Sequence, residues 1–212
     1  MAMIEATYID HMGSDLTVVN AARVSFGKKS EEFSDKDAKL INYLAKHKHI
    51  SPFGHCFASF HVKAPIFVAR QLVKHKFLRW NEISRRYVDS DPEFYEPKDW
   101  RGRSADKKQG SDGVVSNFSL SLTNSYNFAR ALQDYHFMLK QGVAPEQARM
   151  VLPQSTMTEW YWSGSLDAFA SMCHLRCKPD TQYETRIVAE QIHGILADIF
   201  PESWSALRAY GE

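Results

Sequence analysis

Residues 56–65 constrain the fold of this chain more than any other segment. Apolar and polar side chains alternate over nine positions, which predicts a β-strand with one buried face and one polar face. Pro65 then suits the first turn of a helix, where its missing amide hydrogen would have had no partner. The chain therefore needs a sheet with one side buried and the other polar. The apolar positions are Cys56, Ala58, Phe60, Val62 and Ala64, and the polar ones are Ser59, His61 and Lys63.

The remaining pattern predicts mostly helices. Residues 2–9 alternate loosely and suggest an opening strand, and Ser34 with Asp37 resembles a capping box at a helix start. Residues 88–114 are rich in Asp, Pro, Gly, Lys and Ser without an apolar period, so we expect a long mobile loop there. These features indicate one α+β domain over residues 1–212. Further helices are expected over 66–76 and 118–141, from Pro145, from Ser165, and from a second capping box at Thr181 and Glu184 to Pro201.

Composition restricts the class of protein. The 212 residues are 44% hydrophobic and 24% charged with a net charge of +1, which fits a soluble globular protein and argues against a chain that coats nucleic acid. No segment approaches the roughly 18 apolar residues that a membrane-spanning helix needs, so we expect a cytoplasmic protein. We also expect reduced thiols and no metal. The groups that could suggest a metal are Cys173 with Cys177, and His47 with His49 and His55.

One segment is strongly basic. Residues 69–87 place six cations and His75 around a single carboxylate, Glu82. Like charges at this density repel one another unless an anion neutralises them, so the segment predicts a phosphorylated ligand. The sequence has neither a Gly-x-x-x-x-Gly-Lys nor a Gly-x-Gly-x-x-Gly motif, so phosphate binding must rely on side chains. The six cations are Arg70, Lys74, Lys76, Arg79, Arg85 and Arg86.

The same segment resembles the flavin-dependent thymidylate synthases. That family has an Arg-His-Arg triplet, seven further residues, and then a serine within an Asn-Glu-x-Ser-x-Arg-Tyr string. This chain has Lys74-His75-Lys76, seven residues and then Ser84, within the string from Asn81 to Tyr87. Further segments resemble family elements in the right order, which makes the joint match specific. They are Ala21–Ser25, Lys46–Phe53, Ala148–Pro153 and Leu175–Arg176.

The resemblance implies one catalytic domain, with a central, mainly antiparallel sheet flanked by helices, that converts dUMP to dTMP. Methylenetetrahydrofolate would supply the carbon, NADPH would reduce FAD, and tetrahydrofolate would leave after the flavin hydride has reduced the transferred carbon. A homotetramer with active sites at its subunit interfaces is also implied, without nucleic-acid or membrane partners. The family would place the nucleotide at Gln71, Glu82, Ser84, Arg86, Arg149 and Arg176, with Arg176, Ser84 and His49 catalytic. It would place FAD at Ser25, Ser51, Lys74, His75, Lys76 and Ser171.

The chain departs from the family at several flavin positions. Lys74 and Lys76 replace arginines, and lysine keeps the charge but loses the two-pronged geometry of a guanidinium group. We therefore expect the replacement to affect flavin affinity more than the reaction. The positions at which the family usually has an Asn and an Arg fall near Ser165, Asp167 and Ser171. Asp180 stands where a histidine of the family often helps to hold the flavin.

Other interpretations of these residues stay open. The chain could be a flavin-free relative that serves as a nucleotide-binding subunit. It could instead bind nucleic acid through residues 70–86, with Phe77 and Trp80 as stacking groups. Individual residues also have ordinary structural explanations. Glu82 could neutralise Arg79 or Arg86, and Arg149 could pair with Glu146.

Overall fold

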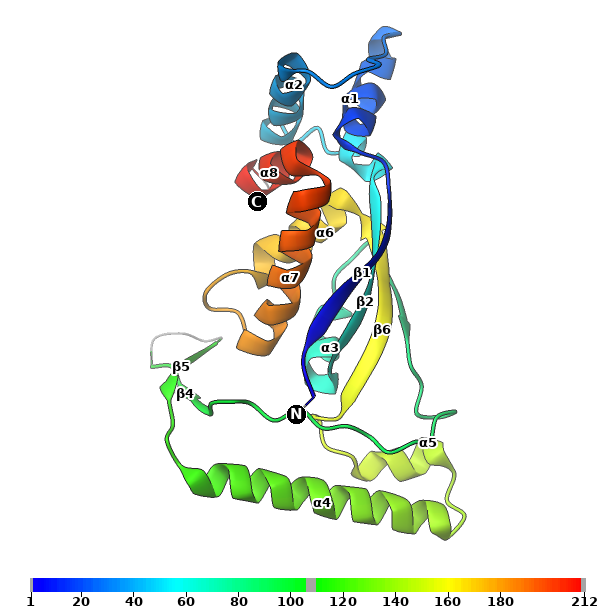
Figure 1. The fold of residues 1–212 in the computed structure, drawn as a ribbon, viewed down its shortest axis with the longest axis vertical. Coiled ribbons are helices and arrows are strands. Elements are labelled where there is room, and N and C mark those ends of the chain that lie inside the picture. Colours follow the sequence, from blue (N-terminus) through cyan, green and yellow to red (C-terminus); the bar gives the residue numbers. More distant parts are fainter. Residues whose placement is uncertain (1, 106–109, 211–212) are drawn as a thin grey trace.

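A four-stranded antiparallel sheet lies at the centre of the computed structural model, which describes residues 2–105 and 110–210 (Figure 1). The strand order is β1-β2-β6-β3, so distant parts of the sequence lie side by side in the sheet. This confirms the predicted α+β class with a mainly antiparallel sheet. The strands are β1 (Glu5–Met12), β2 (Phe57–Pro65), β6 (Met157–Ser165) and β3 (Leu78–Glu82).

The alternation in residues 56–65 forms β2 as predicted. Its apolar positions are at most 1% exposed, whereas Ser59, His61 and Lys63 on the other face are half-buried. β2 pairs with β6 along its whole length, and this register places Phe60 opposite Trp162. Both rings meet Phe169 edge-on, at centroid distances of 5.2 and 5.6 Å. Interlocked aromatic rings therefore form the core between the sheet and its helices.

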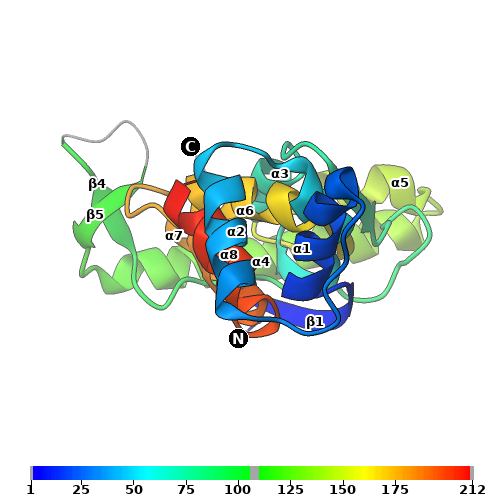
Figure 2. The same ribbon diagram turned by 90° about the horizontal axis from the view of Figure 1, so that it is seen from above.

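Helices cover one face of this sheet and cap its upper end. The helices α3 (Ile66–Leu72), α6 (Leu166–Arg176) and α7 (Tyr183–Ile199) pack against the strands. At the upper end in Figure 1 lie α1 (Asp15–Arg23), α2 (Asp35–Lys46) and α8 (Pro201–Tyr210), and α8 lies beside α2 (Figure 2). Short 3-10 helices are η1 (Val24–Phe26), η2 (Ser51–His55) and η3 (Arg149–Val151).

Side-chain caps position two of the upper helices. The predicted capping box of α2 is confirmed, because the Ser34 amide donates to Asp37 Oδ2 at 2.9 Å. The buried Asp15 carboxylate accepts from the backbone amides of Glu202 and Ser203, at 3.0 and 2.9 Å. A carboxylate at the amino end of α8 satisfies amides that have no partner within the helix. Asp15 therefore ties α1 to α8.

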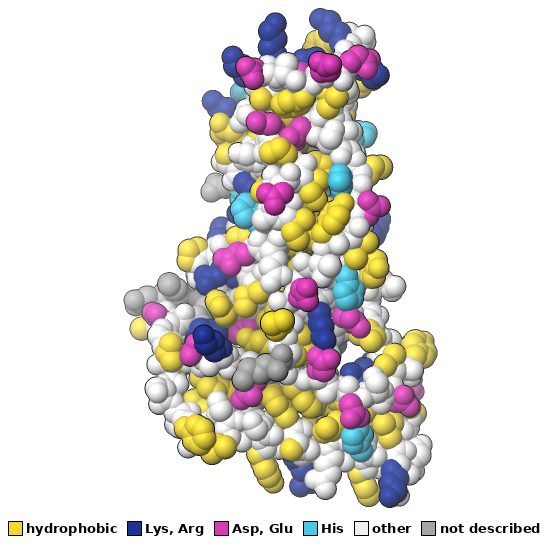
Figure 3. All heavy atoms as spheres, viewed as in Figure 1, with side chains coloured by type: hydrophobic (Ala, Val, Ile, Leu, Met, Phe, Trp, Pro, Cys, Tyr) yellow, Lys and Arg dark blue, Asp and Glu magenta, His cyan; other side chains and the backbone are white. Residues whose placement is uncertain are grey.

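A long helix lies apart from the core at the lower end. The predicted helix is α4 (Phe118–Lys140), followed by Gly142 with a φ of 82° and by α5 (Pro145–Ala148). Tyr135 is the one residue of α4 that is fully buried. Apolar side chains gather along this end of the molecule in Figure 3. Those exposed on α4 are Phe118, Leu122, Tyr126 and Phe137.

The prediction that residues 88–114 contain no regular structure is wrong. Strands β4 (Arg101–Arg103) and β5 (Ser111–Val114) form a hairpin, of which residues 106–109 lie outside the described part. Arg101 forms an ion pair with buried Glu184, which also accepts a hydrogen bond from Tyr95 Oη at 3.3 Å. Gly110 approaches the α6–α7 turn so closely that an added Cβ would lie 2.7 Å from the Asp180 carbonyl oxygen. These contacts therefore hold the hairpin against α7 and the α6–α7 turn. They do not test the mobility expected for residues 88–114, which stays a prediction.

Several element boundaries differ from those predicted. The helix expected over 66–76 ends at Leu72, and Pro65 is the last residue of β2 and the N-cap of α3. The prediction of a capping box at Thr181 and Glu184 is wrong, because α7 begins after Gln182. The Thr181 hydroxyl donates to the Leu175 carbonyl oxygen, and Glu184 pairs with Arg101. Pro201 follows the end of α7 but also begins α8. Besides β4, β5 and the short 3-10 helices, the elements that were not predicted are α1, β3, β6 and α8.

Candidate active site

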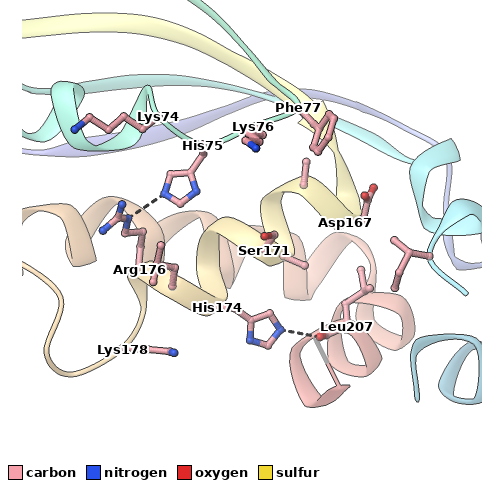
Figure 4. Close-up of a pocket in the computed structure, with 14 residues that line it drawn as sticks. Lys74, His75, Lys76, Phe77, Asp167, Ser171, His174, Arg176, Lys178 and Leu207 are labelled. Atoms are coloured by element: carbon pink, nitrogen blue, oxygen red, sulfur yellow. Dashed lines mark hydrogen bonds between the residues drawn. The ribbon is translucent and has the colours of Figure 1, made fainter. Parts of the chain in front are cut away.

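A cavity of about 780 Å³ lies between the turn after α3 and one face of α6 (Figure 4). Its charged and polar lining comes from both elements and from the α6–α7 turn. Ile50 and Leu207 add apolar walls from the upper end of the molecule. The full lining comprises Ile50, Lys74, His75, Lys76, Phe77, Asp167, Ala168, Ala170, Ser171, His174, Leu175, Arg176, Lys178 and Leu207.

The turn after α3 directs the basic triplet into this cavity. Because α3 ends at Leu72, residues 74–76 are not helical, and Phe77 adopts a left-handed φ of 65° before β3 begins. A left-handed phenylalanine is strained, and such strain is concentrated at functional sites. Phe77 is also 82% exposed and lines the cavity. The backbone therefore turns sharply enough to present Lys74, His75 and Lys76 towards α6.

Helical spacing supplies the opposite wall. Asp167, Ser171, His174 and Lys178 follow one another at intervals of three or four residues, which places them along one side of α6 and just beyond its end. Just before this helix, Gly164 of β6 lies opposite Leu78 of β3, and an added Cβ there would lie 2.4 Å from Leu78 Cδ2. The sequence prediction included only Ser171 from this face. The helical interval counted from Ser171 was the signal that could have found the others.

His75 and Arg176 meet across the cavity. Arg176 Nε donates a hydrogen bond to His75 Nε2 at 2.9 Å, although 101 positions separate the two residues. Burial, and then the charge of Arg176, lower the pKa of His75 from 6.5 to about 4. Burial also lowers the pKa of Arg176 from its ordinary value. The pair therefore carries a neutral imidazole beside a guanidinium at neutral pH.

The other polar lining groups are three lysines, Asp167, Ser171 and His174. None of the ion pairs found among residues 2–105 and 110–210 involves Lys74, Lys76 or Lys178. Within the same described ranges, Asp167 Oδ1 is buried without a hydrogen-bond partner. His174 Nε2 is bound to the Leu207 carbonyl oxygen at 2.9 Å. The cavity thus offers positive charge to an anion and apolar walls to a flat ring.

A second cluster of candidate residues lies at the far end of β3. Arg86 forms an ion pair with Glu146 at 3.5 Å, and Arg149 Nε donates to the Glu146 backbone carbonyl oxygen at 3.1 Å. Ser84 Oγ accepts from the Arg86 amide at 3.3 Å. β3 spans five residues, roughly 17 Å at 3.4 Å per residue, between the basic turn and Ser84. Within one chain, these residues therefore do not join the cavity.

The remaining predicted residues lie outside both groups. Glu82 accepts from Thr158 Oγ1 at 2.7 Å and from Trp80 Nε1 at 3.1 Å, not from the arginines considered for it. Gln71 on α3 has a buried Oε1 without a partner among the described residues. Exposed His49 lies 6.1 Å from the Tyr43 ring. Ser25 lies in η1, and Ser51 begins η2 directly after Ile50 of the cavity wall.

The described part of the chain holds neither a metal cluster nor a membrane span. No three His, Cys, Asp or Glu side chains there form a group that could hold a metal ion. No helix in residues 2–105 and 110–210 is long and apolar enough to cross a membrane.

Trp80, considered above as a stacking group for bases, is stacked on Trp160 at a centroid distance of 4.3 Å.

Comparisons with known proteins bear on the family to which this chain belongs. Residues 7–202 match the family model described as thymidylate synthase complementing protein. Over 203 residues the chain is 41% identical to a flavin-dependent thymidylate synthase of Thermus thermophilus, covering 95% of this chain and 74% of that protein. The chain belongs to the flavin-dependent thymidylate synthase family.

Other members extend the match. The flavin-dependent thymidylate synthase of Gluconobacter oxydans is 38% identical over 210 residues, covering 95% of this chain and 69% of that protein. Among solved structures, the chain is similar to a UMP/dUMP methylase, PolB from Streptomyces cacaoi, bound with 5-Br dUMP. The TM-score is 0.89 at 32% identity, covering 99% of this chain and 97% of that one. The family match does not favour the nucleic-acid-binding interpretation.

Proposed function

We propose that this chain is a single catalytic domain that converts dUMP to dTMP. Methylenetetrahydrofolate is the carbon donor, NADPH is the reductant, and FAD is the flavin. The observation that carries the proposal is the cavity, which brings Lys74, His75, Lys76, Ser171 and Arg176 together from two distant segments in a chain of this family. We place the reaction in the cytoplasm.

The residues of the cavity fit a flavin. Ala168, Ala170 and Leu207 give it apolar walls for a flat ring, and lysines without ion pairs among the described residues surround it. Lys74 and Lys76 would hold the diphosphate as point charges, since an ammonium group lacks the paired donors of a guanidinium group. When bound, the flavin supplies the hydride that reduces the transferred carbon. Ser171 adds a hydroxyl to the same wall.

Arg176 would stabilise the nucleotide in this site. A fixed guanidinium next to the cavity favours the negative charge that develops on a uracil ring during attack, and such electrostatic effects are often the largest in catalysis. Its partial burial strengthens the effect, because water screens a buried charge less. His49 and Ser84 are the other residues to which we assign catalytic roles, on the family motifs that contain them.

The nucleotide site requires more than one copy of the chain. Ser84, Arg86 and Arg149 would bind dUMP with Gln71 and Glu82, yet β3 separates Ser84 from the basic turn of its own chain. A second copy that presents these residues to the cavity completes the site. Exposed apolar side chains on α4 and the half-polar outer face of the sheet supply contact surfaces for such association. We therefore propose a homotetramer with active sites between subunits.

The experiment combines absorbance with product analysis. Purified protein is expected to show a flavin spectrum after addition of FAD and removal of unbound FAD by gel filtration, and to form dTMP from dUMP only with both NADPH and methylenetetrahydrofolate present. A protein that takes up no FAD contradicts the flavin assignment and favours the flavin-free interpretation. UMP is tested alongside dUMP, because the similar PolB is described as a UMP/dUMP methylase.

A variant tests the cavity itself. Arg176→Ala is expected to abolish dTMP formation, whereas Arg130→Ala on exposed α4 removes an equal charge far from the cavity and should leave turnover unchanged. Turnover of Arg176→Ala near that of Arg130→Ala would remove Arg176 from the site.

A further inference from the structure

We propose that Arg176 positions His75 as a neutral imidazole with its proton on Nδ1, so that His75 offers the cavity a hydrogen-bond donor. The inference deepens the proposed function, on which it rests only for the identity of the ligand. It concerns how one side chain of the basic triplet differs from the two lysines that flank it.

The hydrogen bond determines the tautomer. Arg176 Nε is always a donor, so the His75 Nε2 that it reaches at 2.9 Å must be an acceptor without a proton. In a neutral imidazole one nitrogen donates and the other accepts, which leaves the proton on Nδ1. Figure 4 shows this bond on one side of the ring, with the second nitrogen turned away from Arg176.

The surroundings keep the ring neutral. Lys74 and Lys76 flank His75 in sequence, and Arg176 and Lys178 share the cavity with it, so a further proton would add to an existing positive charge. His174 and Asp167 are the other titratable groups of the lining, on α6. Burial acts in the same direction, since it disfavours the charged form of histidine.

This arrangement gives the triplet two kinds of binding group. The lysines attract an anion, whereas a neutral Nδ1–H suits an uncharged acceptor, such as a carbonyl oxygen or ring nitrogen of a planar heterocycle. A neutral imidazole can also lie beside such a ring without carrying its own hydration shell. His75 therefore recognises the ring part of the ligand and the lysines recognise its phosphates.

Nuclear magnetic resonance of the histidine side chains tests the tautomer without any flavin. In ¹⁵N-labelled protein at pH 7, His75 is expected to show a protonated Nδ1 and a pyridine-like Nε2. A ring protonated on Nε2, or on both nitrogens, overturns the proposal. The variant His75→Phe assigns the resonance.

Two variants separate the hydrogen bond from the charge. Arg176→Met removes the donor and is expected to release His75 into a mixture of tautomers. Lys178→Met removes a positive charge from the same cavity and should leave the tautomer as in the wild type. An unchanged tautomer in Arg176→Met, or the same change in both variants, contradicts positioning by the hydrogen bond.

Flavin affinity tests the donor. His75→Asn places an amide near the position of Nδ1, and His75→Gln places one near Nε2. We expect FAD binding to weaken less than threefold in His75→Asn and about tenfold in His75→Gln, the loss of one ordinary hydrogen bond. The reverse order overturns the Nδ1 assignment. Absence of FAD binding in the wild type refutes the proposed function, while the tautomer measurement still decides the role of Arg176.

Discussion

The ion pair between Arg101 and Glu184 is expected to hold the β4–β5 hairpin onto the body of the molecule. The Glu184 side chain is 5% exposed and that of Arg101 is 25% exposed. Arg101 also lies over the Tyr183 ring at 4.6 Å and donates to Ser111 Oγ at 2.9 Å, so it joins both strands to α7. Removing it leaves a buried carboxylate with Tyr95 as its remaining partner.

The magnitude follows from burial. Breaking a buried ion pair costs about 3–5 kcal/mol, because the remaining charge is left desolvated without its partner. Water can reach the partly exposed Arg101 end, so we expect about 2–3 kcal/mol for Arg101→Met. Glu184→Gln keeps a side-chain oxygen that can accept the hydrogen bond from Tyr95 Oη. The double variant removes both charges and should therefore be less destabilised than the sum of the single variants.

Urea unfolding at one fixed protein concentration measures these differences, since stability depends on concentration if chains associate. The wild type, the two single variants and the double variant form a double-mutant cycle. Their unfolding free energies give the coupling free energy of the ion pair, which we expect to be about 1–2 kcal/mol. Arg130→Met serves as the matched control, because its pair with Asp134 lies on the exposed surface of α4. Its midpoint should stay close to that of the wild type. A coupling free energy near zero would refute the reasoning.

Three further predictions follow from individual sites. Burial and Arg176 lower the pKa of His75 to about 4, so as pH falls the unfolded chain binds a proton at this residue before the folded protein does. The free energy of unfolding, measured by urea titration, should therefore decrease between pH 6.5 and about 4, and should decrease less in Arg176→Met. Gly164→Ala should lower the unfolding midpoint and flavin affinity together, since the new Cβ would lie 2.4 Å from Leu78 Cδ2 and 3.1 Å from the backbone oxygen of Phe77, which lines the cavity; an unfolding midpoint equal to that of the wild type would contradict this reasoning. Burial raises the pKa of Cys56 to about 11, so this thiol should resist alkylation at pH 8 in the folded protein and react after unfolding, as mass spectrometry can determine.

Elements with local signals were predicted well. The strand at β2 and the capping box of α2 depend on neighbouring side chains, which the sequence displays directly. β6 was missed although Thr158, Trp160 and Trp162 alternate in it, because a strand is also defined by distant partners that no local pattern names. The prediction of a capping box at Glu184 was wrong for a related reason, because its partner is distant in the sequence. Arg101, 83 positions away, binds the carboxylate that the helix start was expected to use.

The sequence by itself determined the family, the local elements and the chemistry that the side chains can perform, because residue types and their spacing suffice for these. Tertiary structure alone decided which candidates meet. It joined His75 to Arg176 across 101 positions, and it held Arg86 and Arg149 away from that pair at the other end of β3. The physical reason is that antiparallel pairing of β3 with β6 directs the basic turn towards α6, while the extended strand carries the following residues away from it.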